Sequence, residues 1–213
     1  MSIAGRAKAF FMTGSRSRKI SHFYEHFKDG MTVLDAGVSW GTNSDTATEN
    51  FFLKHFRYDP KYYTGLGVQD LTGLRERHPG KTFITYPGGR FPFADQQFDW
   101  VFSNAVIEHV GDEQAQLMFL NEMLRVGKNV FFTTPNKFFP IETHTSLPLI
   151  HWYDPLFYWF CRKTNRYVRR ENLNLLSFGR LRKIVNASQA KRTGFRKNRL
   201  FGWPMTFTVV CSK

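Results

Sequence analysis

Two short groups of carboxylates and imidazoles carry the residue types that proton transfer needs. Glu108 and His109 are adjacent, and one residue separates Glu142 from His144. A carboxylate can orient an imidazole, which then accepts or donates a proton near neutral pH. Each group follows an apolar, strand-like segment, so both are expected at the carboxyl edge of a sheet, where α/β proteins bind ligands. We therefore predict catalytic roles for all four side chains. The alternatives are that the first pair only caps a loop and that His144 packs beneath Trp152.

The same residue types bind metal ions, and this reading is weaker. Glu142, His144 and His151 carry suitable atoms, but their spacing is generic and matches no metal motif. The two cysteines, Cys161 and Cys211, form neither a disulfide framework nor a zinc-binding pattern. The sequence analysis therefore predicts no metal.

A glycine-containing segment is the second feature that could do chemistry. A buried-strand run over 32–36 is followed by Gly37-Val38-Ser39-Trp40-Gly41 and then by a helical run through Leu53. Glycine permits positive φ and a close approach of ligand to backbone, and a helix offers unpaired N–H groups at its first turn. This order is typical of the opening unit of a nucleotide-binding sheet. The five residues also fit the G-x-S-x-G elbow of serine hydrolases, with Ser39 as nucleophile. That elbow normally follows several strands, whereas this one follows the first.

Strands and helices alternate along the chain, which predicts an α/β fold with a mostly parallel sheet. Helices are expected over 1–28, 71–77, 156–162 and after Ser177, and the best one is capped by Asp112 and closed by Gly127. The expected strands are 32–36, 62–68, 81–86, 98–103, 129–134, 195–200 and 206–212.

The length of 213 residues suits a single domain. We divide it into a helical extension (1–30), a cofactor-binding half (31–135) and a remainder (136–213) with an acceptor loop, basic helices and closing strands. The first residues lack the apolar core of a signal peptide, and no apolar stretch is long enough to span a membrane. These features predict a cytoplasmic location.

Positive charge is concentrated in the last quarter of the chain. Residues 1–160 hold 16 Lys and Arg against 16 Asp and Glu, whereas residues 161–213 hold 14 against one, Glu171. The aromatic run 156–160 directly precedes this block. A surface of this kind is typical of proteins that bind nucleic acid, anionic lipid or phosphorylated substrates, and the alternative is a solvated face without a partner.

Three motifs in order resemble the class I S-adenosylmethionine-dependent methyltransferases. They are Val33-Leu34-Asp35-Ala36-Gly37, the segment 92–99 (PFADQQFD) and the segment 103–110 (SNAVIEHV). The segments 123–127 and 131–136 continue the likeness, which covers roughly residues 30–140. The resemblance implies a Rossmann-like seven-stranded, mostly parallel sheet with helices on both faces and an antiparallel C-terminal strand. It also implies S-adenosylmethionine as cofactor.

The resemblance also assigns roles to residues. Asp35 and Gly37 match the turn that approaches the methionine end of the cofactor, although Ser39 and Gly41 stand where alternating glycines are usual. Asp70 after the second strand is the candidate for the ribose hydroxyls, with Gln69 as the neighbouring alternative. The acid often found near the adenine is absent, so backbone and packing at 87–89 would hold that ring. The full cofactor-binding set is Asp35, Gly37, Ser39, Gly41, Asp70, Gly88, Asn104 and Ala105.

The loop 136–152 is similar to a bacterial subgroup associated with cell-surface polysaccharide and lipopolysaccharide clusters. This implies O-methylation of a glycan, lipid-linked or small-molecule acceptor, with contact between the basic quarter and the anionic inner face of the membrane. Three alternatives remain: an RNA-directed methyltransferase, a non-catalytic cofactor-binding domain and, remotely, the serine hydrolase. Against nucleobases, the fourth strand lacks the Asn/Asp-Pro-Pro-aromatic motif of amino-directed enzymes, and no Pro-Cys pair supplies a cytosine nucleophile.

Overall fold

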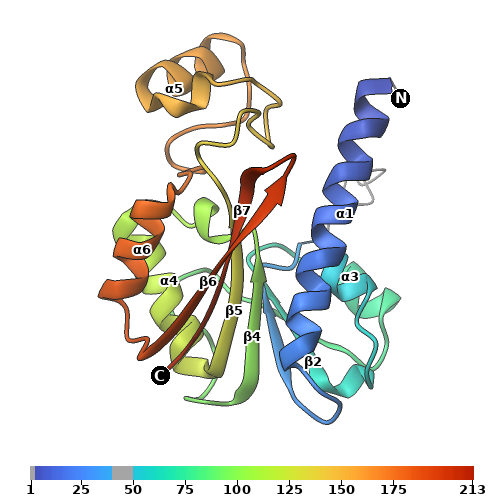
Figure 1. Cartoon of the computed structure of the whole chain (residues 1–213). Coiled ribbons are helices and arrows are strands. Elements are labelled where there is room, and N and C mark those ends of the chain that lie inside the picture. The colour runs from blue at the N-terminus through green and yellow to red at the C-terminus, as the bar shows by residue number, and fades with distance from the viewer. Residues whose placement is uncertain (1–2, 40–49) are drawn as a thin grey trace.

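The computed structural model describes residues 3–39 and 50–213, with side chains from residue 13 onward. The strands of the described residues form one seven-stranded sheet in the order β3-β2-β1-β4-β5-β7-β6 (Figure 1). Strand β7 is antiparallel to both β5 and β6, and the other described pairings are parallel. The expected sheet is thus confirmed. The strands are β1 (Val33–Ala36), β2 (Tyr63–Gly67), β3 (Thr82–Thr85), β4 (Phe98–Asn104), β5 (Gly127–Pro135), β6 (Arg192–Leu200) and β7 (Trp203–Ser212).

Helices cover both faces of the sheet. In Figure 1, α4 and α6 lie on one face, and α1 and α3 lie on the other. The α-helices are α1 (Ile3–His26), α2 (Phe51–Lys54), α3 (Thr72–Arg77), α4 (Glu113–Val126), α5 (Asp154–Lys163) and α6 (Phe178–Ala187). Short 3₁₀ turns are η1 (Pro60–Tyr62), η2 (Ile107–His109) and η3 (Ile150–Trp152). No helix among the described residues is long and apolar enough to cross a membrane.

Aromatic packing fixes α1 and α2 against the sheet. Phe23 of α1 lies against Phe102 and Phe131, with ring centroids 5.1 and 5.3 Å away. Phe52 of α2 stacks on Phe102 at 4.2 Å. All of these rings are buried, and such pairs stabilise the fold beyond the area that they remove from water. These contacts fix α1 and α2 on one face of the sheet, next to β1.

Helix α4 begins and ends where expected, with Asp112 before its first residue and Gly127 after its last. The Asp112 carboxylate accepts a hydrogen bond from the Ala115 N–H at 3.0 Å, which confirms the cap. Gly127 has a φ of −109°, so it is not a left-handed helix end; it starts β5 directly. Its need for glycine is steric, because a Cβ there would lie 2.6 Å from a methyl group of Val101.

The segment 136–177 and the β6–β7 turn lie beyond the carboxyl ends of the central strands (Figure 1). The Trp203 Nε1–H donates to the Phe138 carbonyl at 3.0 Å, which ties the β6–β7 turn to this segment. A separate small core of Phe157, Cys161, Val168, Leu173 and Leu175 gives α5 its own support.

Candidate active site

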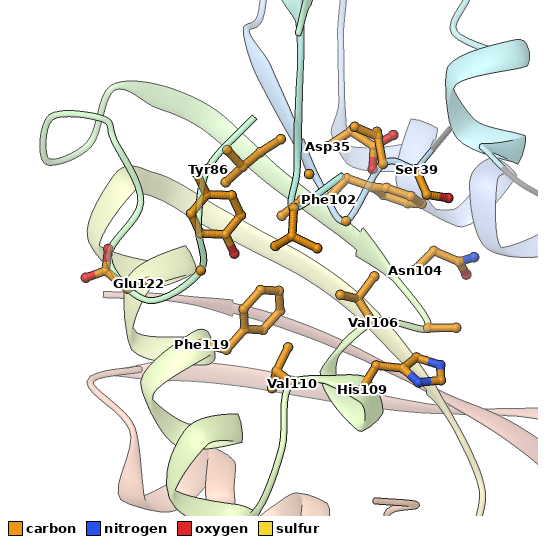
Figure 2. A pocket seen from close by; sticks show the side chains of 18 of the residues that line it. Asp35, Ser39, Tyr86, Phe102, Asn104, Val106, His109, Val110, Phe119 and Glu122 are labelled. Atoms are coloured by element: carbon orange, nitrogen blue, oxygen red, sulfur yellow. The ribbon is translucent and has the colours of Figure 1, made fainter. Parts of the chain in front are cut away.

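A cavity of about 1110 Å³ opens at the carboxyl ends of β1, β2 and β4. Its volume is slightly above the usual range for small-molecule sites, about 300–1,000 Å³, so a nucleotide-sized cofactor and a second small molecule can both fit. Figure 2 shows aromatic side chains, Tyr86 and Phe119, on one side and the polar Asn104 and His109 on the other. Seven of the eight residues assigned to cofactor binding are described, and six of them line this cavity: Asp35, Gly37, Ser39, Gly88, Asn104 and Ala105.

The turn after β1 is anchored to β2. The N–H groups of Gly37 and Val38 both donate to the Leu66 carbonyl, at 2.8 and 3.1 Å. Gly37 has a φ of +109°, and a Cβ there would lie 2.3 Å from a Val106 methyl group. Glycine is therefore required by the fold itself, and the substitution Gly37→Val would disturb Val106 as well as a bound cofactor. Gly41 lies outside the described residues.

Ser39 is held through its backbone. Its N–H donates to Asn50 Oδ1 at 3.1 Å, and its carbonyl accepts from Asn50 Nδ2 at 2.5 Å. The described hydrogen bonds of Ser39 thus join it to Asn50 and not to a histidine. This geometry does not support the serine-hydrolase interpretation.

Asp35 is a buried acid on the cavity wall. Its Oδ2 accepts a hydrogen bond from the Tyr63 hydroxyl at 2.5 Å. Burial raises the pKa of Asp35 to about 7, against the opposing effects of the Tyr63 hydrogen bond and the Lys81 charge. A cationic ligand nearby would favour the charged carboxylate.

The ribose assignment needs a correction at the end of β2. Asp70 is exposed and does not line the cavity; its Oδ1 accepts from the Thr72 N–H and hydroxyl, at 3.0 and 2.7 Å. These bonds also lower the pKa of Asp70. The carboxylate is therefore engaged at the start of α3. Gln69 lines the cavity, so the geometry favours it over Asp70.

The aromatic wall was not predicted from the sequence. Tyr86 follows β3, and Phe119 comes from the inner face of α4 (Figure 2). Gly88 and Gly89, which follow Tyr86 in the chain, have φ values of +96° and +77°. A Cβ at either position would have no atom within 4 Å. A glycine turn beside aromatic rings leaves an open, flat space that suits a base.

The end of β4 carries backbone strain. Ala105 has a φ of +57°, which is rare for a residue with a Cβ, and its N–H donates to the Thr133 carbonyl at 2.9 Å. Asn104 Oδ1 accepts from the Thr133 hydroxyl at 2.8 Å. Strain of this kind persists where surrounding contacts enforce it, and it often marks a functional site.

His109 and His144 meet at the cavity wall, 35 residues apart in sequence. Their Nε2 atoms lie 3.1 Å apart, and the rings are nearly perpendicular. His109 Nδ1 lies 2.7 Å from the Asn172 carbonyl, and His144 Nδ1 lies 2.6 Å from Glu142 Oε1. Contacts at Nδ1 thus fix the orientation of both rings, with Nε2 of each ring facing the other. His144 pairs with His109, and the ring that packs against Trp152 is Phe138.

Glu142 is a buried positioning residue and does not line the cavity. It accepts bonds from the His144 N–H and Nδ1 and from the N–H and hydroxyl of Thr145, at 2.5–2.9 Å. Burial alone would raise its pKa, but the His144 and Thr145 interactions lower the pKa of Glu142 to about 2. An ionised Glu142 therefore holds His144 in place, which corrects the expectation of a directly catalytic carboxylate.

Glu108 is also buried and absent from the cavity lining. Its Oε2 accepts from the Thr134 hydroxyl at 3.0 Å, and its Oε1 has no hydrogen-bond partner among the described residues. His151 is buried as well, with Nε2 2.9 Å from the Phe139 carbonyl, so it braces the loop.

With this geometry established, comparison with known proteins gives a family match. Residues 34–130 match the model of a family described as a methyltransferase domain. No curated protein matches the chain.

Three solved structures share the fold. A SAM-dependent methyltransferase of Methanosarcina mazei has a TM-score of 0.58 at 14% identity, covering 90% of this chain and 96% of that chain. A possible histamine N-methyltransferase of Thermotoga maritima has a TM-score of 0.58 at 13% identity, covering 92% and 87%. Magnesium protoporphyrin IX methyltransferase of Synechocystis, solved with bound SAH, has a TM-score of 0.53 at 12% identity, covering 95% and 83%. At these identities the likeness concerns the fold alone.

The domain match and the fold together imply S-adenosylmethionine as the cofactor. The cavity fits it, because an exposed glycine turn, an aromatic wall and a buried acid surround a space of sufficient volume.

Proposed function

We propose that this chain, with its methyltransferase domain over residues 34–130, transfers the methyl group of S-adenosylmethionine to a hydroxyl of a glycan or a lipid-linked or small-molecule acceptor. The observation that carries the proposal is the His109–His144 pair, which lines the same cavity as the Gly37 turn. Cofactor and acceptor can then meet between the turn and the imidazoles.

The protein would contribute orientation and proton handling. Methyl transfer from a sulfonium is an in-line displacement, so holding the acceptor oxygen in line and excluding water account for much of the rate. A hydroxyl is a weak nucleophile until its proton is drawn away. His109 and His144 are the described polar side chains placed for this, and Glu142 and the Asn172 carbonyl fix their ring orientations.

Different parts of the cavity wall suit different parts of the cofactor. The rings of Tyr86 and Phe119 suit the adenine, and Gln69 at the end of β2 suits the ribose. Asp35 would face the cationic methionine end, where a charged carboxylate is most useful.

A methyl-transfer assay on a panel of acceptors tests the proposal. We expect S-adenosylhomocysteine to form with sugar nucleotides or polyprenyl-phosphate sugars, and not with RNA. Turnover on RNA alone would support the nucleic-acid alternative. Cofactor binding without turnover on any acceptor class would support a non-catalytic domain.

We further propose that the enzyme works at an anionic membrane surface. The described residues of this end expose Tyr153, Leu156, Trp159, Tyr167 and Phe201. Arg162 and Lys163, at the end of the helix that carries Leu156 and Trp159, are exposed as well. Aromatic residues favour the membrane interface, and each basic residue near an anionic surface contributes about 1 kcal/mol.

Not every basic residue of this segment is available to lipid. The Arg166 Nη1 donates to the Thr145 carbonyl at 3.0 Å, and Arg169 donates to the carbonyls of Arg166 and Val168. Arg166 thus contacts the loop that carries His144, and Arg169 fixes the backbone of the segment that carries Arg166. Neutralising them would damage the site whether or not a membrane is involved.

Flotation with anionic vesicles tests this surface. We expect salt-sensitive binding that is reduced by Arg162→Gln with Lys163→Gln, and separately by Trp159→Ala. The matched control is Arg182→Gln, an exposed residue of α6 on the face of the sheet. Equal binding by all variants, or none by the wild type, would overturn the membrane proposal.

A further inference from the structure

The His109–His144 contact poses a question of proton placement. The Asn172 carbonyl can only accept, so His109 Nδ1 must carry a hydrogen. Glu142 accepts hydrogen bonds from the His144 N–H and from the N–H and hydroxyl of Thr145, and the His144 Nδ1 that lies 2.6 Å from its Oε1 is placed as a further donor. In two neutral imidazoles, both Nε2 atoms then present lone pairs to each other at 3.1 Å. That arrangement is repulsive unless a cation, either a proton or a metal ion, lies between them.

A third ligand stands beside the pair. A carboxylate oxygen of Glu108 and the ring nitrogens of His109 and His144 all lie within 4.8 Å of one another. Glu108 is fully buried, and its Oε1 has no hydrogen-bond partner among the described residues. Lys19 is buried near enough to interact with the charge of Glu108, yet it does not satisfy that oxygen. A buried carboxylate oxygen without a donor is costly unless something positive binds it.

We infer that Glu108, His109 and His144 bind one divalent transition-metal ion such as Zn²⁺. Zn–N bonds of about 2.0–2.1 Å place two tetrahedral ligands about 3.3 Å apart, close to the observed Nε2 separation. Two imidazoles and a carboxylate form a known ligand set that leaves a position open.

The surroundings match those of metal-bound histidines. Such a residue usually donates its other ring N–H to a carboxylate or a backbone carbonyl. Here Glu142 serves His144, and the Asn172 carbonyl serves His109. The Thr134 hydroxyl in turn donates to Glu108. Hydrogen bonds on the side away from the proposed ion thus fix the orientation of all three ligands before any ion binds.

The site has a role only if the proposed methyl transfer is correct. An ion on the cavity wall would bind the acceptor oxygen and lower the pKa of its hydroxyl. The imidazoles would then hold the ion and would not take the proton themselves. Metal binding is a separate claim and can be measured without cofactor or acceptor.

The test uses the full chain after chelator treatment and dialysis. Co²⁺ binding is followed by visible absorption, and Zn²⁺ binding by calorimetry and by the rise in the unfolding midpoint. We expect one site, weakened at least tenfold in Glu108→Gln and a hundredfold or more in His144→Ala. Glu108→Gln keeps the side-chain volume and an acceptor for Thr134, so it reports on the ligand without emptying the core.

A second cluster in the described residues provides the matched control. His22, Glu25 and His26 lie together on α1, away from the cavity lining. His26→Ala should leave the Co²⁺ spectrum unchanged. Equal affinity in the wild type and His144→Ala, or no spectral change at all, would overturn the metal site and leave a shared proton between the imidazoles.

Failure of the site and failure of the function can be told apart. If the wild type gives no Co²⁺ spectrum and the chelated protein transfers methyl groups at the full rate while His144→Ala does not, the metal site is wrong and the proposed function stands. If the metal binds as expected and no acceptor is methylated, the site stands and the proposed function falls.

Discussion

The two walls of the cavity are built by different physical means. The wall proposed for the cofactor rests on apolar strands: β1 is buried at every position, and the neighbouring rings of Phe52, Phe102 and Phe131 stack on one another. The acceptor side has few regular elements near the site, and a buried carboxylate, Glu142, holds its loop with four hydrogen bonds. Apolar packing tolerates conservative changes, whereas a buried hydrogen-bond network around one carboxylate is disrupted when that charge is removed.

This difference suggests how the two sides can be separated by mutation. A change on the acceptor side should affect turnover without affecting cofactor affinity. Conversely, a change on the cofactor side should alter affinity and leave the imidazole pair intact.

The largest effect is expected from His144→Ala. It removes one half of the imidazole pair at the acceptor wall, so methyl transfer should fall a hundredfold or more, the usual range for a lost proton-handling group. Cofactor affinity, measured by calorimetry, should stay within about twofold, because His144 lies on the acceptor side. A parallel loss of affinity would show that the two walls are not independent.

Glu142→Gln should give the next largest effect, about 10–100-fold in turnover by analogy with lost orienting partners. Glutamine offers one acceptor oxygen, so its amide group would face the donors of His144 or Thr145. The matched control is Glu113→Gln, a half-buried carboxylate of α4 that pairs with Lys183 away from the cavity lining. Unchanged turnover in Glu142→Gln would show that the buried charge does not position the imidazole.

On the cofactor side, Gln69→Ala should weaken S-adenosylmethionine binding by about tenfold, the equivalent of roughly 1.4 kcal/mol. Asp70→Ala should leave affinity unchanged and slightly lower the unfolding midpoint, because its carboxylate accepts hydrogen bonds from Thr72 at the start of α3. Calorimetry and thermal unfolding of both variants show whether Gln69 or Asp70 binds the ribose. The reverse pattern would restore the original ribose assignment to Asp70.

The smallest effect is a pH dependence set by Asp35. The folded protein holds the pKa of this acid at about 7, above its ordinary value of 3.8, so the neutral form predominates below pH 7. A cationic cofactor favours the charged form, and its affinity should therefore rise as pH increases from 6 to 8.

The Asp35→Asn variant provides the control for this pH dependence. In this variant, the part of the rise in cofactor affinity that is due to Asp35 should disappear. Any pH dependence that comes from titration of the cofactor itself would persist in both proteins. The same pKa makes a second prediction: without cofactor, wild-type stability should decline from pH 4 to 7 relative to Asp35→Asn, since the unfolded chain releases the proton first.

The comparison also explains what could be predicted from the sequence. The strand–turn–helix order and the Asp112 cap are local signals, and the structure has the expected sheet and cap. The choice between Gln69 and Asp70 was not settled by the sequence, because only the fold decides which side chain at the end of β2 lines the cavity, and in the structure that residue is Gln69.

The acceptor wall was harder to predict. Glu108, His109, Glu142 and His144 have suitable chemistry, but which of them meet at the cavity and which lie buried behind it depends on contacts across 35 residues. Phe119 reaches the cavity only because α4 packs against the sheet, and its helical spacing resembles ordinary core. Local patterns indicate such residues as candidates, and long-range packing decides their roles.

In the proposed arrangement, one cavity holds the cofactor on its apolar side and the acceptor on its imidazole side. A crystal structure with S-adenosylhomocysteine would show directly whether this is so. We expect the adenine between Tyr86 and the Gly88 turn, the ribose at Gln69, and the sulfur at Gly37, open toward His109 and His144. A sulfur atom turned away from the two imidazoles, or a ligand bound outside this cavity, would contradict it.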